Sequence, residues 1–154
     1  MNWKTEATER LRNMDTMRQS LVSIPEEIKR LEAAARSVRG ATTDKTPVQG
    51  GGSRREDAWL NNIVQRQMLA HNLRQAESWI RSTQGALSVL SPQERLILLR
   101  LYICPEPKAL ERLAGELGIE QSSIYRHRDR ALKKFTMALY GVQENGSVAT
   151  GTEY

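Results

Sequence analysis

Apolar residues that recur at steps of three and four near the start of the chain constrain its fold more than any other feature. They are Met14, Met17, Leu21, Ile24, Ile28, Leu31, Ala35 and Val38. Such heptad spacing places one apolar stripe along a helix, where it packs against a second helix. Pro25 lies inside the stripe, removes one backbone donor and clashes with the carbonyl one turn earlier. We therefore expect the helix to kink or restart there, and Ser23 and Glu26 have capping-box spacing for a restart.

A second apolar stripe follows a stretch rich in glycine and threonine. Residues 40–53, GATTDKTPVQGGGS, have no hydrophobic period and predict a loop. Their glycines lack the Gly-Lys-Ser/Thr ending of a phosphate-binding P-loop, which favours a flexible connector. A further helix is expected from Ser53 to about residue 87 or 90, with apolar positions at Leu60, Ile63, Ala70, Leu73, Ile80 and Leu87. We predict an antiparallel coiled-coil hairpin over residues 1–90, whose stripes pack on each other or mediate self-association.

Aromatic residues are scarce, at 5% of 154 residues, and charged residues make up 27%. This composition suits helices that cover each other with Leu, Ile and Ala, so we expect an all-α fold. Trp59 and Trp79 lie on or beside the second stripe, where packing in a core or interface is favoured over a base-stacking platform. The formal net charge of +5 favours a polyanionic partner, with nucleic acid ahead of an anionic membrane.

The reactive side chains form no recognisable catalytic or metal site. Cys104 is the only cysteine, which excludes an internal disulfide and a multi-cysteine zinc site. His71 has no partner at metal-ligand spacing, and no acid, base and nucleophile share a motif. We therefore expect a protein that is not an enzyme and uses no metal or cofactor. No apolar run approaches the roughly 20 residues that span a bilayer, and the N-terminal segment lacks the apolar region of a secretion signal, so a soluble cytoplasmic protein is expected.

The C-terminal third of the chain carries clear helix boundaries. Ser91, Pro92 and Glu94 supply an N-cap, a first-turn proline and a capping-box glutamate, so a helix begins there. It ends in residues 104–108, CPEPK, because prolines cannot continue it. Gly118 supplies the left-handed residue that ends a second short helix. The apolar positions of that second helix are Leu110, Leu113, Ala114 and Leu117.

Ala114, Gly118 and Ile124 have the order and spacing of a helix-turn-helix motif. In that motif the small residue lets the second helix approach, the glycine makes the tight turn, and the branched residue seats the second helix on the first. We expect the second helix to start near Gln121. Its inner face then comprises Ile124, Ala131, Leu132 and Phe135, and its outer face comprises Ser122, Ser123, Arg126, Arg130, Lys133 and Lys134.

The outer side of this helix is the candidate DNA-binding site. A major groove admits an α-helix whose N-terminal residues reach base edges, while later basic residues meet phosphates. The candidate base readers are Gln121, Ser122, Ser123, Tyr125 and Arg126. The candidate phosphate contacts are Arg128, Arg130, Lys133 and Lys134. The alternative is a solvated basic face that binds nothing, and His127 is expected to be a half-buried packing residue rather than a DNA contact.

Two segments, LSPQERLILLRLYI and LERLAGELGIEQSSIYRHRDRALKKF, resemble region 4 of sigma-70-type transcription factors. The resemblance covers about residues 90–136 and includes the LSP.ER opening, the LA..LGI turn and the RALKKF close in order. The whole chain is similar to small phage- and prophage-encoded sigma-like regulators of the ArpU and RinA kind. The resemblance implies a virus-derived protein of the bacterial cytoplasm that binds double-stranded promoter DNA, docks on RNA polymerase and controls transcription. An aromatic-rich region 2 is missing, so the chain is not expected to melt a promoter by itself.

Three functions remain open on these observations. The first is a sequence-specific transcriptional regulator of phage or prophage genes, with residues 1–90 forming a homodimer or contacting polymerase and residues 91–140 binding DNA. The second is a DNA-recognition subunit of phage DNA packaging, of the small-terminase type, which also joins a helix-turn-helix to oligomerising helices. The third is a helical adaptor that binds only proteins. Residues 141–154 are small and polar, and we predict that they are disordered.

Overall fold

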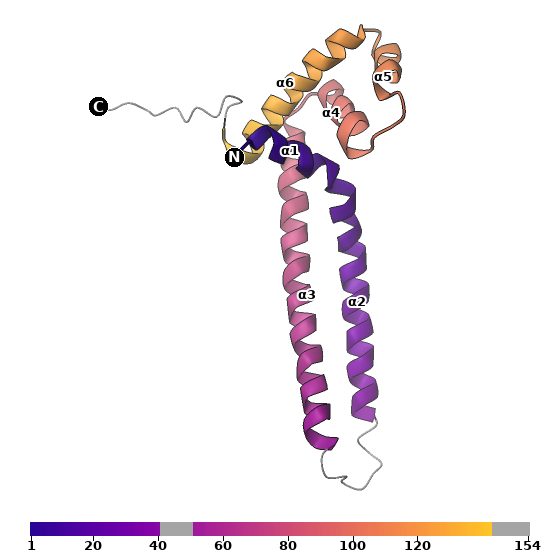
Figure 1. Ribbon diagram of the computed structural model, residues 1–154, viewed down its shortest axis with the longest axis vertical. Coiled ribbons are helices and arrows are strands. Elements are labelled where there is room, and N and C mark those ends of the chain that lie inside the picture. The colour runs from indigo at the N-terminus through magenta and orange to yellow at the C-terminus, as the bar shows by residue number, and fades with distance from the viewer. Residues whose placement is uncertain (41–50, 143–154) are drawn as a thin grey trace, which may run out of the picture. The chain divides into compact units, whose positions relative to one another are not determined.

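The computed structural model describes residues 1–40 and 51–142, and every regular element in these ranges is a helix. The predicted all-α fold class is confirmed for this part of the chain. Residues 41–50 of the predicted glycine-rich loop and 143–154 of the predicted disordered tail lie outside the described residues. The elements are α1 (Trp3–Arg12), α2 (Met14–Gly40), α3 (Gly51–Ser88), α4 (Pro92–Leu98), the π-helix η2 (Leu99–Ile103), α5 (Ala109–Leu117) and α6 (Gln121–Tyr140) (Figure 1).

The chain divides into two compact units that do not follow the boundary expected at residue 90. One unit combines Met1–Thr16 with Trp79–Tyr154, and the other is Met17–Ser78. Helix α1 and the last turns of α3 therefore belong with the C-terminal helices. Ala7 and Leu11 of α1 are fully buried in that unit. A helical period identifies a buried face but not the helix that covers it, which is why the sequence grouped α1 with the coiled coil.

The core of the first unit lies beneath α6. Ile97 of α4, Leu113 of α5 and Ile124 of α6 form one buried cluster. The predicted inner face of α6 is buried, since Ile124, Ala131, Leu132 and Phe135 are at most 2% exposed. At the other end of α6, the ring of Tyr140 lies with its centroid 4.9 Å from that of Trp3. Helix α6 is therefore held along its length by α1, α4 and α5.

In the second unit, α2 and α3 lie side by side (Figure 1). Asn62 Nδ2 of α3 donates to the carbonyl oxygen of Leu31 of α2 at 2.8 Å. Helix α2 continues across Pro25, so it does not restart there as one of the two expected outcomes had it. The helix tolerates the loss of one backbone N–H donor because its other turns keep their hydrogen bonds. Leu31 is buried as the heptad pattern predicts, whereas Leu60 is 53% exposed and does not lie in the packed seam.

Candidate nucleic-acid interface

Helix α4 begins with the capping box that the sequence predicts. The hydroxyl oxygen of Ser91 accepts from the Glu94 N–H at 3.1 Å, and the Glu94 Oε1 accepts from the Ser91 N–H at 3.1 Å. Pro92 occupies the first turn, where its missing N–H carries no penalty. These contacts fix the residue at which α4 begins.

An ion pair fixes α5 against η2. Arg100 of η2 donates from its two Nη atoms to the two carboxylate oxygens of Glu116 at 3.1 and 3.0 Å. Its Nη1 also lies 3.4 Å from Glu106 Oε2. The hydrogen bonds to Glu116 raise the pKa of Arg100 above its ordinary value despite its partial burial. Because two parallel N–H···O bonds set orientation as well as distance, this pair determines how α5 lies before the turn into α6.

The turn between α5 and α6 closes on Gly118, which adopts the left-handed conformation with φ +66°. Its N–H donates to the carbonyl of Ala114, and the Ile119 N–H donates to the same oxygen at 3.2 Å. These bonds satisfy a carbonyl that the helix end leaves open. Beyond its own helix and chain neighbours, no described atom lies within 4 Å of the position that a Gly118 Cβ would take, so the backbone angle rather than lack of space selects glycine here. The predicted left-handed glycine is confirmed.

Helix α6 begins at Gln121, as predicted, and its first turn is open. The N-cap residue, Glu120, makes no side-chain cap hydrogen bond. The N–H groups of Ser123 and Ile124 donate to the Glu120 carbonyl at 3.0 and 3.2 Å. A helix leaves its first N–H groups without intrahelical partners, and such donors bind anionic oxygens well. The start of α6 is therefore suited to contact a phosphate.

Four polar side chains form an exposed stripe along α6, which we call the α6 stripe. It consists of Ser122, Arg126, Arg130 and Lys133, all of which are exposed. Spacings of four, four and three residues place them on one face, over a length of roughly 16 Å. The core residues of the helix occupy the opposite side. The stripe therefore presents three cations to solvent from a rigid backbone.

Two of the stripe residues differ in how they are held. Arg126 Nη2 donates to the hydroxyl oxygen of Ser123 at 3.1 Å, which orients its guanidinium near the start of the helix. Arg130 makes no ion pair with any residue that the structure describes. Gln121 is exposed, Tyr125 is 42% exposed, and both lie in the first two turns beside Arg126. These residues therefore gather at the open end of α6.

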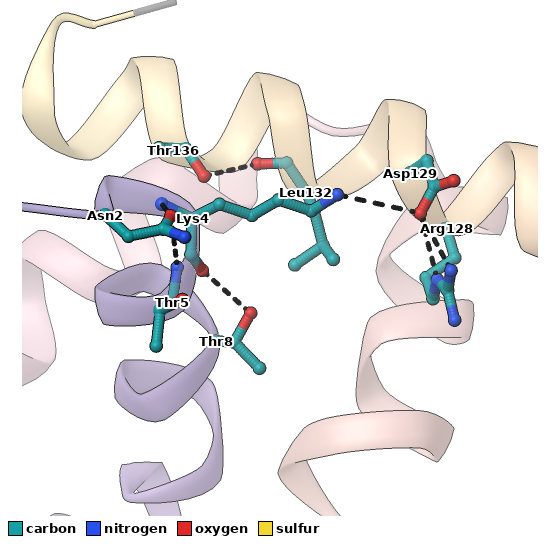
Figure 2. A network of polar contacts seen from close by, with 8 residues as sticks. All are labelled: Asn2, Lys4, Thr5, Thr8, Arg128, Asp129, Leu132 and Thr136. Carbon is teal, nitrogen blue, oxygen red and sulfur yellow. Dashed lines mark hydrogen bonds and ion pairs between the residues drawn. The ribbon is translucent and has the colours of Figure 1, made fainter. Parts of the chain in front are cut away.

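Arg128 is engaged with neighbouring side chains instead of extending from the stripe. Its Nε and Nη2 donate to Asp129 Oδ1 at 3.1 and 2.9 Å, and its guanidinium carbon lies 4.9 Å from the centroid of the Tyr125 ring. Lys4 Nζ of α1 lies 3.9 Å from the same carboxylate oxygen (Figure 2). Asn2 caps α1 by accepting from the Lys4 N–H at 3.1 Å. The negative charge of Asp129 is therefore balanced by two cations, one of which comes from α1.

Lys134 is also engaged, although it is half exposed. Its Nζ donates at 3.0 Å to Oε1 of Glu94, whose side chain is 7% exposed. The second oxygen of Glu94, Oε2, is buried without a hydrogen-bond partner. Burial alone would raise the pKa of Glu94, but hydrogen bonds from Lys134 and Ser91 outweigh it and hold the pKa below its ordinary value. This pair joins the C-terminal half of α6 to the start of α4.

The structure therefore divides the predicted site residues into two groups. Gln121, Ser122, Ser123, Tyr125, Arg126, Arg130 and Lys133 lie in or beside the α6 stripe. Arg128 and Lys134 make ion pairs within the protein, and His127 is half-buried, as expected. Sequence reasoning missed Asp129 and Lys4. It assigned Glu94 as a helix cap, but no sequence signal linked this residue to Lys134, which lies 40 positions further along.

No group of His, Cys, Asp or Glu side chains in the described ranges could hold a metal ion. Among the same residues, no helix combines the length and apolar character needed to cross a membrane. Comparisons of the chain with family models, curated proteins and solved structures found no match.

Proposed function

We propose that the protein is a sequence-specific, DNA-binding transcriptional regulator in which α5 and α6 act as a helix-turn-helix. The observation that supports this most directly is the α6 stripe, with its buried opposite face and open first turn. A helix with its side chains is roughly 10–12 Å across, and a major groove is about 12 Å wide. The stripe is therefore of the size and charge to enter a major groove.

Each predicted site residue has a role in this proposal. Gln121, Ser122 and Tyr125 contact base edges at the start of α6, and Arg126 binds a guanine, for which arginine is the commonest partner. Ser123 acts indirectly, because it holds the Arg126 guanidinium at 3.1 Å. Two further residues, Arg130 and Lys133, contact phosphates. Finally, Lys134 joins α6 to α4 through Glu94, whereas Arg128 is held by Asp129 of the same helix.

The resemblance of residues 90–136 to sigma region 4 extends the proposal to promoter DNA of phage or prophage genes in a bacterial cytoplasm. Under that resemblance, RNA polymerase is the protein partner. A single helix-turn-helix buries limited surface, and specific sites usually engage dimers with half-sites about 34 Å apart. We therefore include a homodimer in the proposal.

The proposal is tested by selecting sequences bound by the full chain from a random DNA pool and measuring their affinity at several salt concentrations. Arg126→Ala should weaken binding to the selected sequence by about 10- to 100-fold while changing binding to random DNA little. Lys133→Ala should weaken binding to both and reduce the salt slope by about 1. The two variants thus separate base reading from phosphate contact.

Lys29→Ala is the matched control, since Lys29 is an exposed lysine of α2 and its loss changes the net charge by the same amount. It should leave DNA affinity near that of the wild type. If Lys133→Ala and Lys29→Ala bind alike, the α6 stripe is not the binding face. A wild-type chain with no salt-dependent affinity for any DNA would refute the proposal and favour the helical adaptor.

A further inference from the structure

Helix α3 carries large apolar side chains on a surface that no described residue covers. Leu60, Val64 and Met68 are 53%, 50% and 61% exposed. They are spaced by four residues, so they form one line over successive turns, which we call the α3 stripe. Trp59, at 42% exposed, lies about 100° around the helix from Leu60, on the side of Ile63, and is not part of this line. Single exposed apolar residues are ordinary, but a contiguous group of this kind marks an interaction surface.

The α3 stripe is distinct from the side of α3 that packs on α2. Asn62, which bonds the carbonyl of Leu31, marks that packed side, and Ile63 and Leu73 are half-buried. Helix α3 therefore has two apolar faces, of which α2 covers one. Folding of the single chain does not account for the second.

The segment around the α3 stripe is almost free of charge. Residues 58–73 contain one charged residue, Arg66, whereas the overall fraction of 27% would place about four in sixteen positions. Arg66 is half-buried and its Nε donates to Asn62 Oδ1 at 2.8 Å. Interface cores are depleted in charge and enriched in methionine and aromatic residues. The exposed side of this segment combines Leu60, Val64 and Met68 with uncharged amides and carries no Asp, Glu or Lys, unlike an ordinary solvated face.

We propose that the α3 stripe is the surface on which a second copy of this chain packs its own α3 stripe. A face that meets its own copy must not bring like charges together, and this segment has almost none to bring. The exposed amides of Asn61, Gln65 and Gln67 flank the stripe and can each donate and accept, so identical copies can satisfy one another. A strongly acidic or basic partner would find no complementary charge here.

This inference deepens the proposed function, because it names the surface of the proposed homodimer, but its test needs no DNA. Sedimentation equilibrium of the full chain should give twice the chain mass of 17.5 kDa. Val64→Glu should raise the dimer dissociation constant about a hundredfold or more, because it places a charge in the centre of the interface. At micromolar concentration this variant should sediment as a monomer.

Val22→Glu is the matched control. Val22 is 54% exposed on α2, close to the 50% of Val64, and the substitution is the same. This variant should remain a dimer, and far-ultraviolet circular dichroism should show equal helix content in both. If Val22→Glu dissociates the dimer as strongly as Val64→Glu, the α3 stripe is not the interface.

A cysteine cross-link tests the same surface without a charged substitution. In a Cys104→Ser background, Val64→Cys should form a disulfide between two copies under mild oxidation, and Val22→Cys should not. A monomeric wild type, a closed ring of many copies or the reverse cross-linking pattern would each overturn the inference. A dimer that binds no DNA would refute the proposed DNA-binding function and leave the interface standing. A wild-type monomer that binds selected DNA would refute the interface and the homodimer and leave the DNA-binding function standing.

Discussion

Replacing Glu94 by glutamine tests the contact between the start of α4 and the second half of α6. Glutamine retains an acceptor for the Ser91 N–H but loses the charge that faces Lys134 Nζ at 3.0 Å. Lys134 is half exposed, so water weakens the ion pair, and we expect Glu94→Gln to lower the free energy of unfolding by about 1 kcal/mol. Glu94→Ala also removes the capping box and should lower the free energy of unfolding by about 2 kcal/mol in total.

The dependence of this effect on pH follows from the pKa of Glu94. Burial raises that pKa, but the hydrogen bonds from Lys134 and Ser91 lower it by more than burial raises it. The pKa in the folded protein therefore lies below the ordinary value. A carboxyl group of this kind stabilises the fold above its unfolded pKa of about 4.3, and the contribution disappears as the pH falls through the folded pKa. The difference in stability between wild type and Glu94→Gln should therefore be constant near neutral pH and shrink in acid.

The assay is urea unfolding followed by circular dichroism on wild type, Glu94→Gln, Lys134→Met and the double variant. We expect a coupling energy of about 0.5–1 kcal/mol between the two positions, because each substitution removes the same contact. Lys29→Met, combined with Glu94→Gln, controls for the general loss of a positive charge. Additive effects at positions 94 and 134, within about 0.3 kcal/mol, would refute the role assigned to this ion pair.

Two further predictions concern the turn after α5 and the contact of α1 with α3. Gly118→Ala should lower the free energy of unfolding by about 1 kcal/mol, because φ is +66° and the surrounding space is open. By contrast, Gly85 lies inside α3 with equally open space around it, so Gly85→Ala should raise the free energy of unfolding by about 0.8 kcal/mol. Chemical denaturation measures both changes, and effects of the same sign would contradict this reasoning. Arg10→Ala should lower the free energy of unfolding by about 2 kcal/mol, because it removes three contacts. The Arg10 guanidinium donates to Thr83 Oγ1 at 2.8 Å and to the Trp79 carbonyl at 3.2 Å, and it lies 4.7 Å from the centroid of the Trp79 ring. Unfolding followed by tryptophan fluorescence measures this loss, and a value below about 0.3 kcal/mol would show that these contacts stabilise nothing.

The ends of the C-terminal helices could be predicted from the sequence because local chemistry determines them. Ser91 and Glu94 form a capping box within four residues, and Gly118 ends α5 through a backbone angle that other residues avoid. The buried side of α6 also followed from spacing, with Ile124 and Phe135 as its clearest members. Signals of this kind lie within one or two turns and need no knowledge of the fold.

Contacts between distant segments could not be predicted in the same way. Spacing placed Leu60 in an apolar stripe and made no prediction for Leu11, yet Leu11 is fully buried and Leu60 is 53% exposed. The difference depends on which helix covers each face. Likewise, Lys134 carries the same charge as Arg130, and only its position beside Glu94, which lies 40 residues earlier in the chain, separates them. Charge patterns predict a basic helix, whereas ion pairs depend on the tertiary fold.

Because α1 packs on α6, this compact unit cannot finish folding until late in the synthesis of the chain. Helix α1 ends at Arg12 and α6 begins at Gln121, so 108 residues lie between two helices of one compact unit. At about 5–20 residues per second, a ribosome needs roughly 5–20 s to make that interval. Throughout it, the apolar face of α1 that contains Ala7 and Leu11 has no α6 to cover it. Helix α1 is therefore the first helix of the unit to leave the ribosome but among the last to be packed in its core.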